Sequence, residues 1–114
     1  MKYDFMIEIT LNDELIISEG KYEVSDVYRT IIDYAKEQHL TRLKAKDEKT
    51  LLFGISGDGK DDLAYIALFE TTLINSDWFR KYVNRMFWYE EENGKMIKID
   101  AIKSYDETLA RNGL

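Results

Sequence analysis

The sequence predicts an α+β fold: a single mainly antiparallel sheet of five to seven strands with two or three helices. Three observations support this: apolar and polar residues alternate over 3–11, an amphipathic helix pattern spans 25–39, and an Asn-Gly dipeptide at 93–94 separates two strand-like segments. The 114 residues contain no linker, repeat or low-complexity segment. We therefore expect one globular domain over residues 1–114.

The N-terminal segment has the two-residue period of a half-buried strand. One face of residues 3–11 is apolar and consists of Tyr3, Phe5, Ile7, Ile9 and Leu11. The pair Asn12-Asp13 tolerates turn conformations, and an apolar run resumes over 14–18. This pattern predicts a β-hairpin between the two segments.

The first helix is predicted to begin at Ser25, which is a good N-cap residue and is followed by an acidic first turn at Asp26. It should end near His39. Its apolar residues form a single stripe, made of Val27, Tyr28, Ile31, Ile32 and Ala35. One side of this helix should therefore pack on the sheet.

The middle of the chain is predicted to contain three strands. A short strand is expected at 43–46 and a firmer one at 50–56, before the glycine-rich turn at 57–61. Residues 63–70 are apolar on both faces, which is typical of a strand covered on both sides. We expect this strand at the centre of the core, with its middle residues buried, namely Tyr65, Ile66, Ala67 and Leu68.

The last third of the chain predicts a helix, a hairpin and a second helix. Asn75 or Ser76 can cap a helix that runs to about Arg85. The Asn-Gly dipeptide at 93–94 fits a type I′ turn between strands at 86–92 and 95–103. Ser104 with Glu107 forms a capping-box pattern, which predicts a short C-terminal helix.

Composition limits the classes of function. The chain has no cysteine and one histidine, and its 16 basic against 22 acidic residues give a net charge of −6. Disulfides, thiolate chemistry and zinc-thiolate sites are thereby excluded. No signal peptide and no apolar run of membrane-spanning length are evident, so we expect a cytoplasmic protein without a membrane partner. No motif predicts a metal or a cofactor.

Two groups of residues resemble sites but have simpler interpretations. His39 could act in acid–base chemistry, yet no nucleophile accompanies it, and a histidine is favourable at the end of a helix. Asp58, Asp61 and Asp62 offer oxygen ligands, but their spacing does not match a calcium-binding loop. We interpret His39 as a structural residue and the three aspartates as part of a solvated turn.

Aromatic and basic residues alternate in the last third of the chain. The candidate interaction surface consists of Trp78, Tyr82, Arg85, Trp88 and Tyr89. Such side chains are enriched at the energetic centres of protein interfaces. They could also stack on single-stranded nucleic acid, but the acidic net charge and the adjacent acidic run at 90–92 disfavour that interpretation.

The sequence thus favours a small acidic non-catalytic interaction protein, such as an inhibitor or immunity-type protein for a basic partner. We expect a protein partner and leave homo-oligomerisation open. The alternative is an enzyme or small-ligand module with a carboxylate-lined pocket, in which Glu8, Glu70 and Asp100 converge.

Overall fold

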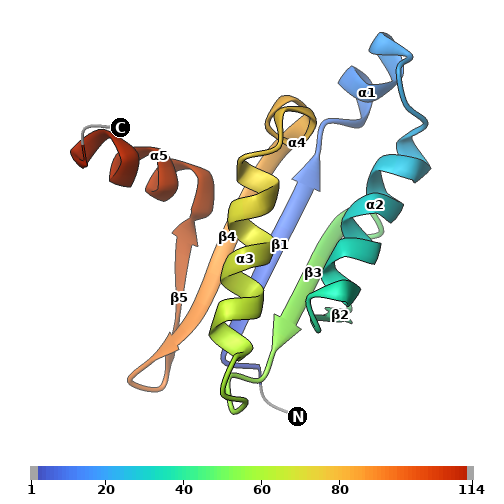
Figure 1. Ribbon diagram of the computed structural model, residues 1–114. Helices are drawn as coiled ribbons and strands as arrows, with labels where there is room; N and C mark the ends of the chain where they lie inside the picture. The colour runs from blue at the N-terminus through green and yellow to red at the C-terminus, as the bar shows by residue number, and fades with distance from the viewer. Residues whose placement is uncertain (1–2, 113–114) are drawn as a thin grey trace.

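The computed structural model describes residues 3–112 and contains one five-stranded antiparallel sheet in the order β2-β3-β1-β4-β5 (Figure 1). The strands are β1 (Phe5–Leu11), β2 (Thr41–Leu43), β3 (Thr50–Ile55), β4 (Val83–Glu92) and β5 (Lys95–Asp100). The helices are α1 (Asp13–Glu19), α2 (Val24–Glu37), α3 (Asp62–Ile74), α4 (Asp77–Tyr82) and α5 (Ala101–Arg111). The α+β class with a single antiparallel sheet is confirmed, but the five helices of this part of the chain exceed the two or three predicted.

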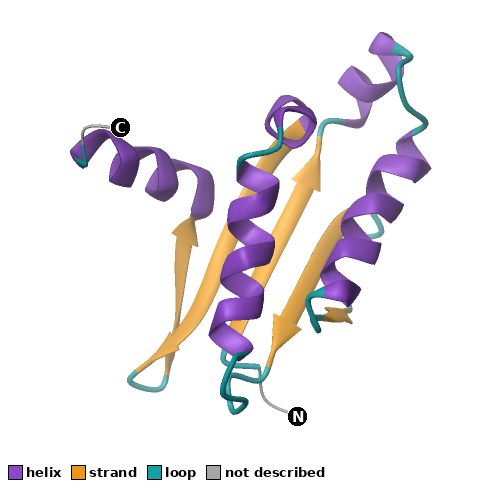
Figure 2. Cartoon of the chain, in the orientation of Figure 1, coloured by secondary structure: helices purple, strands orange, loops and turns teal. Residues whose placement is uncertain are grey.

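Helices α2 and α3 lie side by side over one face of the sheet (Figures 1 and 2). Between these two layers the core is filled by fully buried apolar side chains, among them Ile7 and Ile9 of β1, Ile31 of α2 and Phe69 of α3. The other face of β1 stays partly exposed, as an antiparallel sheet allows. The molecule is accordingly thin, with extents of 44 × 38 × 23 Å.

Residues 14–18 form helix α1, so the predicted N-terminal hairpin is wrong. Asn12 caps this helix, because its Oδ1 accepts a hydrogen bond from the Leu15 amide at 3.1 Å. Gly20 ends it in the left-handed conformation, at φ 65°. Only Ile16 of the helix is buried. The residue that was expected to make a turn thus begins a helix instead, since Asn favours both positions.

Residues 63–70 belong to helix α3, so the predicted central strand is also wrong. Of the four side chains expected to be buried there, only Ile66 is; Leu68 is 52% exposed, and Tyr65 and Ala67 are half-buried. The central strand of the sheet is β1. Because α3 is apolar on all sides, its sequence does not show the helical period that would have identified it as a helix.

The loop before α3 explains why no hairpin forms at 57–61. The Asp62 carboxylate accepts hydrogen bonds from the Gly57 and Gly59 amides at 3.0 and 2.9 Å, and from the Ser56 hydroxyl at 3.0 Å. These bonds hold the pKa of Asp62 below its usual value, the Gly59 amide being the largest cause. The loop is thereby closed on the first turn of a helix rather than on a returning strand.

The remaining elements follow the sequence more closely. Helix α2 buries Val27, Ile31 and Ala35 of its predicted stripe. Strands β4 and β5 form the predicted hairpin, with positive φ angles of 53° at Asn93 and 81° at Gly94.

Three boundaries differ from the prediction. Helix α4 ends at Tyr82 rather than near Arg85, because β4 begins at Val83. Helix α5 begins at Ala101, since the Asp100 carboxylate accepts a hydrogen bond from the Lys103 amide at 3.1 Å and so takes the capping role expected of Ser104. The short strand β2 covers 41–43 and overlaps the expected strand at 43–46 only at Leu43.

Candidate functional site

The five residues of the candidate interaction surface do not form one surface. Tyr82 is 1% exposed, in the core. Arg85 and Tyr89 lie on the uncovered face of the sheet, whereas the neighbouring Trp88 points to the helix-covered face, because successive residues of a strand alternate. Trp78 lies in α4, half-buried beside α2. Trp78 therefore lies apart from the three residues of β4.

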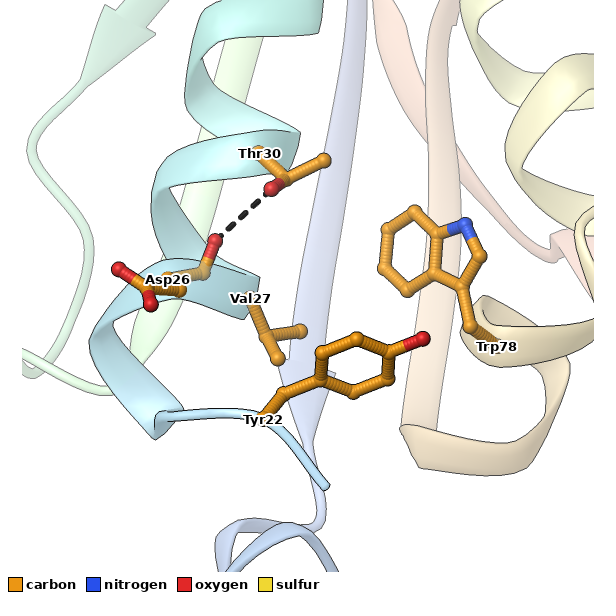
Figure 3. Close-up of a pocket in the computed structure, with 5 residues that line it drawn as sticks. All are labelled: Tyr22, Asp26, Val27, Thr30 and Trp78. Carbon is orange, nitrogen blue, oxygen red and sulfur yellow. Dashed lines mark hydrogen bonds between the residues drawn. The ribbon is translucent and has the colours of Figure 1, made fainter.

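A groove runs past Trp78, with α2 on one side and Trp78 of α4 and the end of α3 on the other. It consists of two adjoining pockets of about 170 and 390 Å³ that share Thr30 and Trp78. The first pocket is lined by Tyr22, Asp26, Val27, Thr30 and Trp78 (Figure 3). The second continues along α2 past Asp33 and Glu37, with Thr72 and Ser76 on the opposite side. The two pockets thus form one groove along α2.

Trp78 is held in the groove by the short helix α4. The buried ring of Phe79 contacts the Trp78 ring edge to face, at a centroid distance of 5.9 Å. Tyr22, at the near end, is 45% exposed and makes an edge-to-face contact with Tyr82 at 6.2 Å. In Figure 3 the Tyr22 ring points toward Trp78, and Val27 extends from α2 beside the Tyr22 ring. The aromatic end of the groove is therefore fixed by the core beneath it.

The α2 side of the groove is acidic. Asp26, Thr30, Asp33 and Glu37 follow one another at intervals of four, three and four residues, which aligns them along one side of the helix. No lysine or arginine is among the residues that line either pocket. Asp26 lies 3.8 Å from the Arg29 guanidinium, but both side chains are largely exposed. In Figure 3 the Asp26 carboxylate points away from Trp78, so the carboxylates available to the groove are those of Asp33 and Glu37.

The predicted convergence of Glu8, Glu70 and Asp100 does not occur. Glu8 lies on the uncovered sheet face, where its Oε1 accepts a 2.7 Å hydrogen bond from the Tyr89 hydroxyl. Asp100 caps α5. Glu70 lies on α3, above the opposite face, and lines a separate pocket of about 200 Å³ with Glu90 and Trp88. The sheet therefore separates Glu8 from Glu70.

The other two groups examined in the sequence have structural surroundings. His39 follows α2 with a positive φ of 65°, and its ring lies 4.4 Å from that of Tyr65. Asp62 organises its own loop, while Asp58 and Asp61 do not join it in a cluster: over residues 3–112 no group of three or more acidic, histidine or cysteine side chains could hold a metal ion. Over the same residues no helix has the length and apolarity needed to cross a membrane.

Sequence reasoning found Trp78 but missed the residues that accompany it. Tyr22 precedes α2 without any recognisable motif. The spacing of Asp26, Asp33 and Glu37 was available as a signal, since it places three carboxylates on one side of a predicted helix. Their proximity to Trp78 depends on the tertiary fold. Comparisons of the chain with protein-family models, with curated proteins and with solved structures found no match.

Proposed function

We propose that the protein is a small non-catalytic interaction protein that binds a basic partner protein through the groove that runs past Trp78. The observation that supports this proposal is that Trp78 shares a groove with Asp33 and Glu37 and that no lysine or arginine lines this groove. A partner of this chemistry would insert a lysine- or arginine-bearing segment into this groove.

Each part of the groove has a role in such a complex. Trp78 is half-buried and already ordered, so covering it removes apolar surface from water at little entropic cost. The carboxylates of Asp33 and Glu37 would pair with basic side chains and fix their register. The net charge of −6 would steer a basic partner toward the protein before contact.

The charge of the groove also opposes the competing classes of partner. Phosphate-bearing ligands would meet Asp33 and Glu37 rather than lysine or arginine, so nucleic acid is disfavoured at this site. The alternative function, small-ligand binding at a carboxylate-lined pocket, has its support elsewhere, in the pocket that Glu70 and Glu90 share.

The proposal is tested by photo-crosslinking from inside the groove. Benzoylphenylalanine placed at position 78 in the full chain should crosslink to a basic protein in an extract of the source cells, whereas the same residue at exposed position 63, on α3, should not. In the background Asp33→Asn with Glu37→Gln the product from position 78 should be lost. The matched background Glu92→Gln with Glu107→Gln, two exposed carboxylates outside the groove, should retain it.

Binding of the crosslinked protein, once purified, provides the quantitative test. Trp78→Ala should weaken the complex by on the order of thirtyfold, or about 2 kcal/mol. Raising the salt concentration should slow association more than it speeds dissociation. The proposal would be overturned if positions 63 and 78 crosslinked equally or if the crosslinked protein were acidic. It would also be overturned if neither Trp78→Ala nor the Asp33 and Glu37 substitutions changed the affinity.

A further inference from the structure

A second pocket, of about 200 Å³, lies on the other side of α3 from the groove. Its walls come from four elements: Ala67 and Glu70 belong to α3, Trp88 and Glu90 to β4, Ile99 to β5 and Ser104 to α5. It shares no lining residue with the groove around Trp78. Whatever this pocket binds can therefore be studied independently of the partner proposed for the groove.

Glu70 is the unusual residue of this pocket. It interrupts the apolar sequence of α3, and its side chain is half-buried. Within residues 3–112 the structure gives Glu70 neither a hydrogen bond nor an ion pair, and burial raises the pKa of its carboxyl to about 7. A carboxyl that faces a pocket without a partner of its own is a feature of binding sites rather than of a satisfied core.

Glu90 and Trp88 form a fixed second wall. The Trp88 indole Nε1 donates a hydrogen bond to Glu90 Oε1 at 3.2 Å, so the ring and the carboxylate are held together. The Trp88 ring also contacts Phe5, at a centroid distance of 5.9 Å. The pocket thus combines one ordered carboxylate, one unpartnered carboxyl and an indole with aliphatic walls.

We propose that this pocket binds an alkylammonium group, that is, a primary amine on a short apolar chain. An ammonium group has three hydrogen-bond donors and no acceptor. The carboxylates of Glu70 and Glu90 only accept hydrogen bonds, and the Ser104 hydroxyl can accept as well as donate them. Ala67 and Ile99 would contact the alkyl chain, and the indole of Trp88 favours a nearby cation. Such a group could come from a free amine or from a lysine side chain of another protein.

Other cations fit these surroundings less well. Calcium takes six to eight oxygen ligands, and magnesium requires an octahedral set. Two carboxylates beside an indole and aliphatic side chains do not supply such a shell. The apolar part of the lining instead favours a cation that carries carbon, because burial of that carbon contributes to the free energy of binding.

The test uses Trp88 as its own reporter. The chain has two tryptophans, so the variant Trp78→Phe leaves Trp88 as the only one. Butylamine titrated into this variant at pH 8 should change the Trp88 emission saturably, with a dissociation constant on the order of 1 mM for so small a ligand. Butanol and potassium chloride, titrated to equal concentrations, test whether the response needs the charge together with the alkyl chain.

Substitutions in the same background test the two carboxyl groups. Glu70→Gln and Glu90→Gln should each raise the dissociation constant for butylamine at least tenfold, and the amide of Glu90→Gln can still accept the bond from Trp88. Glu92→Gln, an exposed position in the same strand as Glu90, should leave it unchanged. The proposal is overturned if butylamine gives no saturation, if butanol or potassium chloride acts equally, or if Glu70→Gln has no effect.

A second arm distinguishes the two sources of the amine. The two ligands compared are butylamine and Nα-acetyl-lysine amide, whose ε-amino group is free. Both carry a primary ammonium group, but only the lysine derivative carries a peptide backbone. Tighter binding of the lysine derivative would identify a lysine side chain as the natural occupant, and tighter binding of butylamine a free amine. Failure of both ligands to bind would overturn the proposal without affecting the crosslinking test at position 78.

Discussion

The hydroxyl of Tyr82, a core residue of α4, donates a 2.6 Å hydrogen bond to Oε1 of Glu19, the last residue of α1. Lys81 forms an ion pair with the other oxygen of the same carboxylate. These contacts join two short helices that are 63 positions apart in sequence at this point. Since Ile16 is the only buried residue of α1, the Glu19 carboxylate is an important attachment of that helix.

Glu19→Gln should reduce stability at neutral pH more than at acid pH. Hydrogen bonds from Lys81 and Tyr82 hold the pKa of Glu19 below its usual value of 4.5. A carboxyl whose pKa is lower in the folded state contributes stability above about pH 4.5, and this contribution is lost as the pH falls through the folded-state pKa. The midpoint of urea unfolding, measured at pH 7 and pH 3, should therefore differ from that of the wild type chiefly at pH 7.

Glu14→Gln is the control for this prediction, because Glu14 is an exposed carboxylate of the same helix with no partner in the Tyr82 contact. It should shift the midpoint little at either pH. An equal shift for Glu19→Gln at both pH values would mean that the carboxylate charge does not matter and that the loss arises from packing.

Arg80 and Asp106 attach the C-terminal helix. The two guanidinium nitrogens of Arg80 donate to the two oxygens of Asp106 at 3.2 and 2.9 Å, joining α4 to α5. Asp106→Asn should therefore increase local opening of α5, seen as severalfold faster amide hydrogen exchange in that helix at low salt. The effect should shrink at high salt, because both side chains are partly exposed.

Arg80→Lys separates geometry from charge in this pair. Lysine keeps the positive charge but cannot form two parallel bonds to one carboxylate. We expect exchange in α5 to lie between that of the wild type and that of Asp106→Asn. If all three proteins exchange alike, α5 is held by its apolar contacts alone, such as that of the buried Ala101.

The sequence predicted the fold best where local chemistry determines the structure. The alternation in β1, the stripe of α2 and the turn at Asn93-Gly94 all lie within a few residues of their signals. The two errors, at 14–18 and 63–70, concern short apolar runs in which a strand and a helix have no distinguishing period. Whether such a run becomes a helix depends on which of its faces the rest of the chain covers, and the sequence of the run alone does not determine this.

The candidate sites depend on tertiary structure even more. Trp78 was predicted as an interaction residue, but Asp33 and Glu37 precede it by some forty positions and line the same pocket only because the tertiary fold places α2 next to α3 and α4. Tyr82 was wrongly grouped with the surface residues, since the register of α4 turns its ring into the core. Glu70 was noticed as a carboxylate, but its neighbour Glu90 follows from strand pairing that no local pattern predicts.

The helical period of α3 can be tested with two alanine substitutions. In a strand, Ile66 and Leu68 would share one face, so both substitutions would be costly. In α3, Ile66 is fully buried, whereas Leu68 is 52% exposed. We therefore expect Ile66→Ala to lower the free energy of unfolding by about 2–5 kcal/mol and Leu68→Ala by less than about 0.5 kcal/mol. Urea denaturation at pH 7 measures both, and similar large losses would contradict the helix.

Glu70→Gln should stabilise the protein above neutral pH. Burial raises the pKa of Glu70 to about 7 in the folded state, above the usual value of 4.5. Between these values the folded state binds more protons than the unfolded state, so this residue makes stability fall as the pH rises from about 4.5 to 7. Because part of the carboxyl faces water, we expect a gain of only about 1–2 kcal/mol for Glu70→Gln at pH 8, with no gain near pH 4.

Urea unfolding at the two pH values measures this gain, with exposed Glu92→Gln as the matched substitution that should show none. If the pocket binds an alkylammonium group, butylamine should reduce the difference in free energy of unfolding between Glu70→Gln and the wild type at pH 8. A ligand at ten times its dissociation constant stabilises the folded state by about 1.4 kcal/mol, and only the wild type retains full affinity for it. An equal gain for Glu70→Gln at pH 4 and pH 8 would contradict this prediction, because a gain that does not depend on pH cannot arise from ionisation of the Glu70 carboxyl.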